Sequence, residues 1–558
     1  MNIAAVNSPN LFKPLSRNET SALRSVLFRH LDGFPIAPTI MALKRHGVLD
    51  LFENKPTVPL EQILSTCGGN EGYLQVAMRL LCSQGWLGQE VNSRTDSIRY
   101  TTTNRTISAF QMADIYHWIE GYLPIATAMD DYLFGELAAQ PEQELKFLRN
   151  QLRKSWGCNA TGDPDIDVVR KQILLHMEGM LLGPILVSMG MRDLLQRYSD
   201  SSRFMAVAHF DGNEQRIKTA LDMFCDMNLA EETEGGCVLN SDGLFFVKRA
   251  AAYGVTVSYL PMFSRVEEML FGDPSALRDL GVGEHERHVD RAMNVWGSGG
   301  AHTTYFKKID EIIIEVFNRP IEEQPLGIAD MGCGDGTFLA HIFDVIWEKT
   351  SRANMLNEYP LTIVGSDYNQ ASIEASKKTL RKADVWANVI FGDIADPDQF
   401  AENLQQEYGV SLKDLLSVRS FLDHNRPYEK PDHVDEHRQS RSTGAFSHRG
   451  KRITNNQIEQ NLVDHFKKWT PHVSRFGLLV LELHTVAPKI AALNVGNTNV
   501  TAYDGTHGFS DQYILEREVF LDAAREAGLH PDERYQARYP DSDLATVSLN
   551  LLMGKPTT

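Results

Sequence analysis

The chain has 558 residues, of which 42% are hydrophobic, and a formal net charge of −18 at pH 7. A length of this order predicts about three or four folding units of roughly 150 residues each. The negative charge argues against a nucleic-acid substrate, because phosphate binding needs a basic surface. The six cysteines, at positions 67, 82, 158, 225, 237 and 333, have no CxxC spacing. This pattern favours a reducing compartment over a disulfide or zinc framework.

The sequence carries no pattern typical of secretion or membrane insertion. The N-terminal residues lack the basic segment and the apolar run of a signal peptide. We also find no stretch of about 18 uncharged apolar residues that could span a bilayer. We therefore expect a soluble, cytoplasmic protein that does not contact a membrane.

The first half of the chain is predicted to be mainly helical. Helical periodicity over 21–52 is followed by LEQIL at 60–64 and GYLQVAMRLLCSQGWL at 72–87, and 98–103 has the pattern of a short strand. Together these elements are typical of a winged-helix-like fold. Such folds often bind DNA through a basic helix, but the candidate at 71–86 has one arginine and the apolar spacing of a core helix. We therefore expect no DNA binding.

This helical pattern occurs twice. GVLDLF at 47 matches GMRDLL at 190, and VAMRLLCSQGWL at 76 matches TALDMFCDMNLA at 219, both at an offset of 143 (190 − 47 and 219 − 76). GYLPIATAMDDYLFG at 121 also resembles SYLPMFSRVEEMLFG at 258. Two copies of one module are therefore predicted. They could serve as a lid over a catalytic cleft, as a docking surface or as a scaffold.

The stretch LGIADMGCGDGTF at 326–338 organises the second half of the chain. A short apolar run ends in an acidic residue, opens into glycines at 332, 334 and 336, and continues into a second apolar series. This is the pattern of a strand, a tight turn and a helix start, in which glycines let the backbone approach a ligand. Asp330 and the lack of a phosphate-binding lysine argue against a nucleoside triphosphate and suit a cationic ligand.

Two further predicted strands end at acidic residues. LTIVGSD at 361–367 ends in Asp367, which could accept hydrogen bonds from a ribose diol, as in dinucleotide-binding folds. The apolar run at 386–391 leads into GDIADP, whose Asp393 could contact an adenine amino group. The units predict an α/β, doubly wound sheet, and the first resembles motif I of class I S-adenosylmethionine (SAM) methyltransferases.

The segment HVDRAMNVWGSGGAHTTYF at 288–306 precedes the first strand of this sheet. Its glycines would let aromatic and polar side chains close over a cofactor at the mouth of the cleft, although a plain glycine loop between domains is an alternative. The residues predicted to contact SAM are Trp296, Gly297, Asp330, Gly332, Gly334, Gly336, Asp367, Tyr368, Asp393 and Ile394.

Catalytic residues are expected at the carboxyl ends of two further strands, at 415–422 and 477–486, because ligands bind there in doubly wound sheets. The segment AYDGTHGFSDQY at 502–513 adds polar groups. Two imidazoles with a carboxylate or carboxamide match a mononuclear iron, manganese or related divalent site. A metal-free histidine base and no chemical role are the alternatives. The side chains expected at this edge are Asp423, His424, Glu482 or His484, His507 and Gln512.

Four segments, NVWGSGGAHTTYF, ADMGCGDG, VRSFLDHNRP and THGFSDQY, together resemble the metal-dependent SAM C-methyltransferase domain of polyketide synthase loading modules, of the apratoxin and saxitoxin starter-unit type. The resemblance covers most of the chain. It implies methyl transfer from SAM to the α-carbon of a malonyl-type group on an acyl carrier protein, in polyketide or related natural-product biosynthesis. The residues it implies are His424, Gln512, His484 and Asp423 as metal ligands, and His424, Tyr305 and His507 in catalysis.

The expected organisation has a winged-helix-like module at 1–137, a connector and second module at 138–285, and the methyltransferase core at 286–558 with an insertion at 429–453. Neighbouring synthase domains, if any, would lie outside this chain. The insertion is basic in an otherwise acidic protein, so it could steer an acidic carrier protein, or it could be a solvated loop without a specific partner. Its basic residues are Arg438, Arg441, His448, Arg449, Lys451 and Arg452.

Two other functions stay open at this stage. A SAM site with His424 as a metal-free base would suit O-methylation of a small phenol or acid, since a winged-helix-like N-terminus occurs in such enzymes. A catalytically idle SAM-fold subunit that scaffolds a synthase is the third interpretation, and the intact glycine, Asp367 and histidine sets argue against it. In the leading interpretation, a metal that chelates a β-dicarbonyl group stabilises the enolate that accepts the methyl group.

Overall fold

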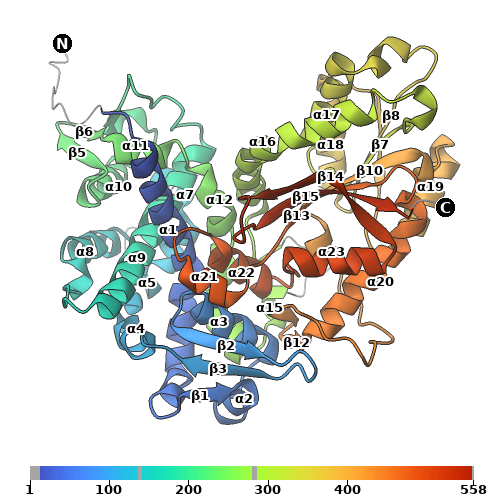
Figure 1. The fold of residues 1–558 in the computed structure, drawn as a ribbon. Coiled ribbons are helices and arrows are strands. Elements are labelled where there is room, and N and C mark those ends of the chain that lie inside the picture. The colour runs from blue at the N-terminus through green and yellow to red at the C-terminus, as the bar shows by residue number, and fades with distance from the viewer. Residues whose placement is uncertain (1–12, 136–140, 279–285, 556–558) are drawn as a thin grey trace.

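The computed structural model describes residues 13–135, 141–278 and 286–555. These residues form a helical N-terminal lobe and a C-terminal lobe built on a sheet (Figure 1). The module boundaries predicted at 137/138 and 285/286 depend on residues outside the described ranges.

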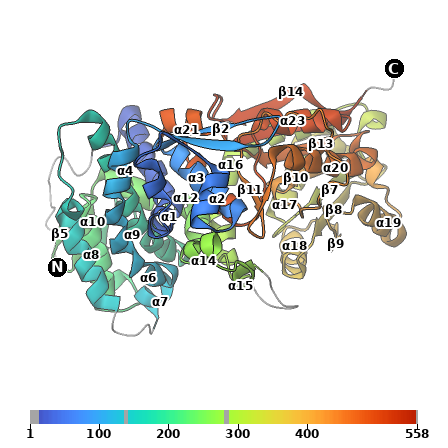
Figure 2. The same ribbon diagram turned by 90° about the horizontal axis from the view of Figure 1, so that it is seen from below.

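Two long helices, α1 (Arg17–Arg45) and α9 (Pro164–Met191), cross in the centre of the N-terminal lobe (Figures 1 and 2). Glycine allows the close approach on both sides of the crossing. A Cβ atom at Gly33 would lie 2.7 Å from the Cα of His176, and one at Gly179 would lie 2.4 Å from the Cα of His30. His30 and Gly179 therefore face each other as Gly33 and His176 do, as expected for two copies of one module related by an approximate twofold axis.

The same symmetry governs the polar contacts of the crossing. The imidazole of His30 is 2.7 Å from the hydroxyl of Tyr253, and that of His176 is 2.6 Å from the hydroxyl of Tyr116. Each histidine therefore contacts a tyrosine of the other copy. α9 is long and apolar enough to cross a membrane by length and composition, but 83% of its apolar window is buried inside the protein, as in a core helix.

Each copy contains a three-stranded antiparallel sheet with the same strand order, β1-β3-β2 and β4-β6-β5. The principal helices, α3 (Glu71–Ser83) and α10 (Glu214–Asp226), begin and end 143 residues apart (214 − 71 and 226 − 83). The duplicated, winged-helix-like N-terminal region is thus confirmed. The strands are β1 (Thr57–Pro59), β2 (Leu87–Val91), β3 (Ile98–Thr102), β4 (Phe204–Ala206), β5 (Ala230–Thr233) and β6 (Gly236–Leu239).

Shorter helices complete this lobe: α2 (Leu60–Cys67), α4 (Thr106–Met112), α5 (His117–Glu120), α6 (Leu123–Thr127), α7 (Met129–Phe134), α8 (Pro141–Arg153), α11 (Ser241–Val247), α12 (Ala251–Ser258), α13 (Leu260–Phe263), α14 (Val266–Phe271) and α15 (Ser275–Arg278).

The C-terminal lobe contains a seven-stranded sheet in the order β14-β15-β13-β10-β7-β8-β9. Neighbours from β13 to β9 pair in parallel, and β15 is antiparallel to both β13 and β14. The predicted α/β, doubly wound sheet is confirmed. The strands are β7 (Gly327–Met331), β8 (Thr362–Asp367), β9 (Ala387–Phe391), β10 (Leu415–Ser420), β13 (Leu478–Leu483), β14 (Leu529–Tyr539) and β15 (Val547–Gly554).

Helices cover both faces of this sheet. Because successive strand residues point to opposite faces, neighbouring residues of one strand pack with different helices. In β7, Ile328 packs with one set of helices and Ala329 with the other. The first set is α16 (Arg291–Val316), α17 (Thr337–Lys349) and α18 (Gln370–Lys382). The second set is α19 (Pro397–Tyr408), α20 (Asn455–Val473) and α23 (Arg517–Glu526).

The predicted insertion at 429–453 joins the lobes. It ends in a hairpin of β11 (Phe446–His448) and β12 (Lys451–Ile453) that packs against α3 of the N-terminal lobe. Arg452 donates to Gln75 of α3 over 3.0 Å. Arg438 instead binds Glu459 and Glu526 of the C-terminal lobe at 2.9 and 2.7 Å. The arginines of this segment therefore serve contacts within the chain.

One helix of the C-terminal lobe is buried in the N-terminal lobe. α22 (Val500–Phe509), which follows α21 (Pro488–Leu493), contributes Ala502 and Phe509 to the hydrophobic core of the N-terminal lobe. A Cβ atom at Gly505 would lie 2.4 Å from that of Pro35 in α1, and one at Gly508 would lie 2.8 Å from a methyl group of Val76 in α3. Both glycines are therefore required by the close packing of the helices.

We predict that Gly505→Ala lowers the midpoint of thermal unfolding, because the added methyl group would collide with Pro35. Overpacking of this kind costs about 1–3 kcal/mol, which outweighs the better helix propensity of alanine. The matched control is Gly299→Ala in α16, where a Cβ atom would meet nothing within 4 Å. A Gly505→Ala midpoint at or above that of Gly299→Ala would contradict the packing.

Candidate functional site

The loop after β7 presents bare backbone at the carboxyl end of the sheet. Gly332, Gly334 and Gly336 have φ angles of +78°, +55° and +79°, in the left-handed region that glycine adopts without strain. A Cβ atom at Gly334 would meet nothing within 4 Å, whereas one at Gly336 would lie 3.0 Å from the Cα of Ser376. The loop is thus closed towards α18 and open at Gly334, where a ligand could approach the backbone.

Asp330 is buried at the end of β7 with a free acceptor. Its side chain is 2% exposed, and among the described residues its Oδ1 has no hydrogen-bond partner. Burial and the neighbouring Asp367 raise the pKa of Asp330 well above its usual range. Asp367 accepts hydrogen bonds from the amides of Gly334 at 3.1 Å and Asn369 at 2.8 Å. An unpaired buried carboxyl beside a second carboxylate suits a cationic ligand such as a sulfonium or an ammonium group.

The predicted adenine contacts lie after β8 and β9. Asp393 accepts from the amide of Ala395 at 2.8 Å, and the carbonyl of Ile394 accepts from the indole of Trp469 at 2.8 Å. Tyr368 is 71% exposed, and its ring centroid is 5.4 Å from that of Phe391. Together with the glycine loop and Asp330, these groups fit SAM in composition and in place.

The segment predicted as a glycine loop over the cofactor is helical instead. α16 runs through it from residue 291 to 316, so the loop prediction for 288–306 is wrong. Trp296 and Gly297 pack on the second N-terminal module: a Cβ atom at Gly190 would lie 2.8 Å from the indole of Trp296, and one at Gly254 would lie 2.6 Å from the Cα of Gly297. These two predicted cofactor contacts are therefore placed in the packing between the lobes.

Tyr305, predicted to be catalytic, lies further along α16 near the end of β10. Its ring centroid is 6.0 Å from that of Phe421 and 4.8 Å from that of Tyr539. Burial raises the pKa of Tyr305, so its hydroxyl stays protonated. Tyr305 thus belongs to an aromatic wall beside the strand that leads to His424.

His424 follows β10 and is held by a carboxylate. Its Nδ1 donates to Oε1 of Glu482 in β13 over 2.5 Å, and its amide donates to Oε2 over 3.2 Å. Because the carboxylate only accepts, Nδ1 carries a proton, and in the neutral imidazole the free lone pair is on Nε2. Leu422, two residues earlier, lies 3.0 Å from where a Cβ atom of Gly332 would be. The His424 segment therefore adjoins the glycine loop.

His507 is the nearest aromatic neighbour of His424 in the site. The two ring centroids are 5.1 Å apart, with the rings edge to face. The Nδ1 of His507 donates to the carbonyl of Tyr503 over 2.8 Å, which leaves its Nε2 free as well. Burial and the neighbouring His424 lower the pKa of His507 to about 3, so this imidazole stays neutral. Two lone pairs of imidazole nitrogens are thus available in one buried place.

Gln512 lies directly beside these histidines. The backbone N–H of Gln512 donates to the backbone carbonyl of His507 over 2.9 Å, and the backbone N–H of Tyr513 donates to the backbone carbonyl of His424 over 2.7 Å. Its side-chain Nε2 donates to the hydroxyl of Tyr259 over 3.2 Å. The segment that follows α22 therefore connects His507 to His424 through the backbone.

The other two predicted metal ligands are engaged elsewhere. His484 has Nδ1 3.2 Å from the carbonyl of Leu515 and Nε2 2.7 Å from the hydroxyl of Ser548, so both nitrogens are occupied. Asp423 is held by Arg419 at 2.5 Å and His465 at 3.0 Å. Although burial opposes the shift, these partners hold the pKa of Asp423 below its usual range. The side chains of His484 and Asp423 are therefore engaged in contacts other than with His424 and Gln512.

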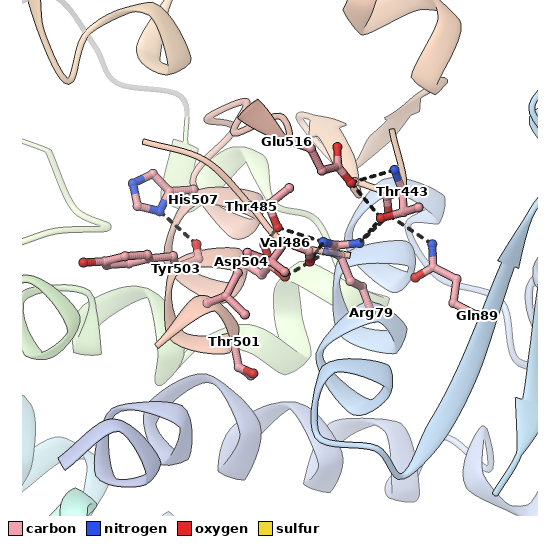
Figure 3. A network of polar contacts seen from close by, with 12 residues as sticks. Arg79, Gln89, Thr443, Thr485, Val486, Thr501, Tyr503, Asp504, His507 and Glu516 are labelled. Atoms are coloured by element: carbon pink, nitrogen blue, oxygen red, sulfur yellow. Dashed lines mark hydrogen bonds and ion pairs between the residues drawn. The ribbon is translucent and has the colours of Figure 1, made fainter. Parts of the chain in front are cut away.

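A third buried group, not predicted, ties α22 to the sheet. Arg79 of α3 is 1% exposed and donates to Asp504 of α22 at 2.9 Å, to Thr485 at 2.8 Å and to the carbonyl of Val486 at 2.9 Å (Figure 3). Asp504 lies one helical turn before His507. The sequence signal for this contact is a single arginine in an otherwise apolar helix, which by itself indicates only that DNA binding is not expected.

Among the described residues, no group of three or more His, Cys, Asp or Glu side chains is arranged to hold a metal ion. His424 and His507 with Gln512 contain two members of that set and a carboxamide. Metal-bound histidines typically donate their other N–H to a carboxylate or a backbone carbonyl, as both of these do. These three residues thus fit a metal in donor chemistry, and the original set of four does not.

The sheet order, the glycine loop and the acidic strand ends define a class I SAM-dependent methyltransferase. The family models agree in the same chain order. Residues 23–89 match the AprA N-terminal domain, residues 178–273 the AprA winged helix domain, and residues 286–550 the AprA MT2-like domain. The C-terminal lobe is therefore similar to the AprA MT2-like methyltransferase domain over residues 286–550. No curated protein matches the sequence significantly.

Solved structures with a similar fold differ widely in sequence. An O-methyltransferase family protein from Burkholderia thailandensis is 13% identical, with 71% of this chain and 100% of that chain covered and a TM-score of 0.38. An O-methyltransferase family 2 protein from Planctomyces limnophilus, in complex with apigenin, is 11% identical, with 98% of each covered and a TM-score of 0.38. The citrinin polyketide synthase CMeT domain is 10% identical, with 80% and 96% covered and a TM-score of 0.32. At these TM-scores the family models remain the basis of the assignment.

We predict that Asp330→Asn weakens SAM binding about 10- to 100-fold, which corresponds to about 1.4–2.8 kcal/mol. The variant loses the charge that pairs with a cationic ligand. Because the ligand favours the ionised carboxylate and the pKa of Asp330 is raised, the affinity of the wild type should increase with pH and that of the variant should not. Isothermal titration calorimetry at several pH values measures both effects.

The control for this measurement is Asp335→Asn, which changes an exposed aspartate of the same loop. Its SAM affinity should equal that of the wild type. Equal losses in both variants would mean that overall charge, rather than the position of Asp330, governs binding.

We predict that Arg79→Ala lowers the unfolding free energy by about 3–5 kcal/mol, because it leaves Asp504 buried without its charge partner. The double variant Arg79→Ala/Asp504→Ala should recover part of this loss. Thermal unfolding midpoints measure both, with the exposed Arg94→Ala as the control. If the Arg79 and Asp504 losses simply add, the two residues do not act as a pair.

Proposed function

We propose that the protein transfers a methyl group from SAM to the α-carbon of a malonyl-type acyl group on an acyl carrier protein, with a divalent metal at His424, His507 and Gln512. The observation that carries the proposal is the pair of buried imidazoles, each fixed through Nδ1 and each with a free Nε2. The pair lies at the carboxyl end of the sheet, where doubly wound folds bind their ligands. There it suits an acceptor substrate with acidic C–H groups and chelating oxygens.

A divalent metal bound here, iron or manganese by the ligand types, would polarise the two carbonyl oxygens of the acyl group and lower the pKa of the α-carbon. The residues of the chain supply the other requirements. Asp330 and the glycine loop orient SAM, and burial excludes water from the reacting carbon. The carboxylate of Glu482 holds the His424 imidazole in one orientation.

The balanced reaction breaks one carbon–hydrogen bond and one carbon–sulfur bond, and it forms one carbon–carbon bond and one bond between the base and the proton. A base removes the α-proton, the α-carbon attacks the methyl group of SAM, and the sulfonium leaves as a neutral thioether. The Nε2 of His424 or His507 could accept that proton only in a state in which that nitrogen does not bind the metal. Glu482 would stabilise the imidazolium that forms on His424, because its carboxylate lies 2.5 Å from Nδ1.

A second function, metal-free O-methylation of a small phenol or acid, is favoured by the same 2.5 Å contact between His424 and Glu482. A histidine held by a carboxylate is a general base in its own right. Metal content separates the two functions. Stoichiometric metal in the active wild type supports the first function, and full activity of metal-free protein supports the second.

The carrier protein is proposed to approach beside the insertion. The arginines of the insertion bind within the chain, among them Arg438 and Arg441, so their charges are partly neutralised. A neighbouring surface cavity of about 680 Å³ is lined in part by Lys430 and Lys467 and reaches His465, which contacts Asp423. The cavity is also lined by Glu429, Asp432 and Asp464, so an acidic carrier would have to pair with Lys430 and Lys467, which have no ion-pair partner among the described residues.

The test is mass spectrometry of malonyl-carrier protein incubated with SAM and ferrous or manganous ion. We expect the mass of one or two methyl groups to be added. His424→Ala and His507→Ala should each lower the rate at least about 100-fold, the lower range for losing a positioned acid–base group. Both should also lose stoichiometric metal. His437→Ala, at an exposed histidine of the insertion, is the control. An unchanged malonyl carrier with every metal tested would contradict the proposal.

A further inference from the structure

The second N-terminal module supplies a side chain to the candidate active site. Tyr259 lies between α12 and α13 in the part of the chain that matches the winged helix domain, and it is 3% exposed. Its hydroxyl accepts from the side-chain Nε2 of Gln512 at 3.2 Å. A residue more than 250 positions away in sequence therefore contacts Gln512 beside the two histidines.

The direction of this hydrogen bond is set by the two atoms that meet. The side-chain Nε2 of Gln512 can only donate, so the hydroxyl oxygen of Tyr259 accepts from it. The NH₂ group of the Gln512 carboxamide, and not its Oε1 atom, therefore faces Tyr259.

This direction leaves the Oε1 atom of Gln512 outside the contact with Tyr259. Among the described residues, no donor is paired with Oε1. The backbone of Gln512 is fixed at the same time, since its backbone N–H donates to the backbone carbonyl of His507 at 2.9 Å. From the first module, Tyr73 donates to the preceding residue, Asp511, at 2.9 Å. Both N-terminal modules thus hold the segment that carries Gln512.

We propose that Tyr259 is a positioning residue for methyl transfer, which it serves by orienting the Gln512 carboxamide so that Oε1 faces His424 and His507. The inference rests on the proposed function, in which Gln512 is a ligand or a contact of the acceptor. It gives the second module a specific task, because the tyrosine that contacts Gln512 belongs to the second copy of the duplicated module.

The duplication supplies a matched control. Tyr122 is the counterpart of Tyr259, since the sequence YLP occurs at 122 and at 259. Tyr122 is also fully buried, but its hydroxyl donates to the carbonyl of Leu181 in α9 at 3.3 Å. The two tyrosines therefore share burial and sequence context and differ in what the hydroxyl contacts. Loss of either hydroxyl should affect stability to a similar degree, and only the loss at Tyr259 should affect the site.

The experiment compares Tyr259→Phe, Tyr122→Phe, Gln512→Ala and the double variant Tyr259→Phe/Gln512→Ala in the full chain. We measure kcat for methyl transfer to malonyl-carrier protein, KM for SAM and metal content. Loss of an outer partner of a ligand typically costs 10- to 100-fold. Tyr259→Phe should therefore lower kcat by about this factor with KM for SAM within about twofold, while Tyr122→Phe keeps the wild-type kcat. In the Gln512→Ala background, Tyr259→Phe should have no further effect.

Wild-type kcat in Tyr259→Phe, or independent effects of Tyr259→Phe and Gln512→Ala, would overturn the inference and leave the proposed function intact. If the wild type methylates no malonyl carrier, the proposed function fails, and crystal structures of the wild type and Tyr259→Phe decide the inference. A Gln512 side chain that turns away from its wild-type position in Tyr259→Phe supports the positioning role. One that stays in place overturns it.

Discussion

The buried ion pair between Arg79 and Asp504 is the contact on which the arrangement of the two lobes depends. Both side chains are almost fully removed from water, so the pair would be costly to bury if its remaining donors were unpaired. Thr485, Val486 and Thr443 accept those donors, and each of these residues belongs to the C-terminal lobe. The first module is therefore fixed to the end of β13 and to α22 by one side chain with five possible donors.

This attachment explains why the candidate site is shared between the lobes. His424 and Glu482 are placed by strands of the sheet. His507 lies in α22 and Gln512 follows it, and the apolar face of this helix lies in the N-terminal core. The two halves of the site meet only because both lobes have their observed relative position. The N-terminal region is thus part of the wall of the site, which the alternatives of a lid, a docking surface or a scaffold did not include.

Sequence patterns predicted the fold well because the sheet and the repeat have local signals. Glycines at 332, 334 and 336 marked the turn after β7, and the offset of 143 residues marked the duplication. The glycine-rich stretch in α16 does not form a loop, because the chain is helical there and Gly297 allows close packing on α12. At β13, alternation left Glu482 and His484 equally eligible. The strand ends at Leu483, so the direction of His484 is set by Ser548 and Leu515 instead. Such long-range partners leave no trace in the local pattern.

The burial of α22 also bears on how such enzymes can be recombined. A methyltransferase unit excised at its family boundary, near residue 286, would keep the whole sheet and still expose Ala502 and Phe509. The cut would also leave Asp504 without Arg79. The smallest portable unit is therefore the chain from α1 onward, and a graft into another protein should transfer the two modules together with the catalytic lobe.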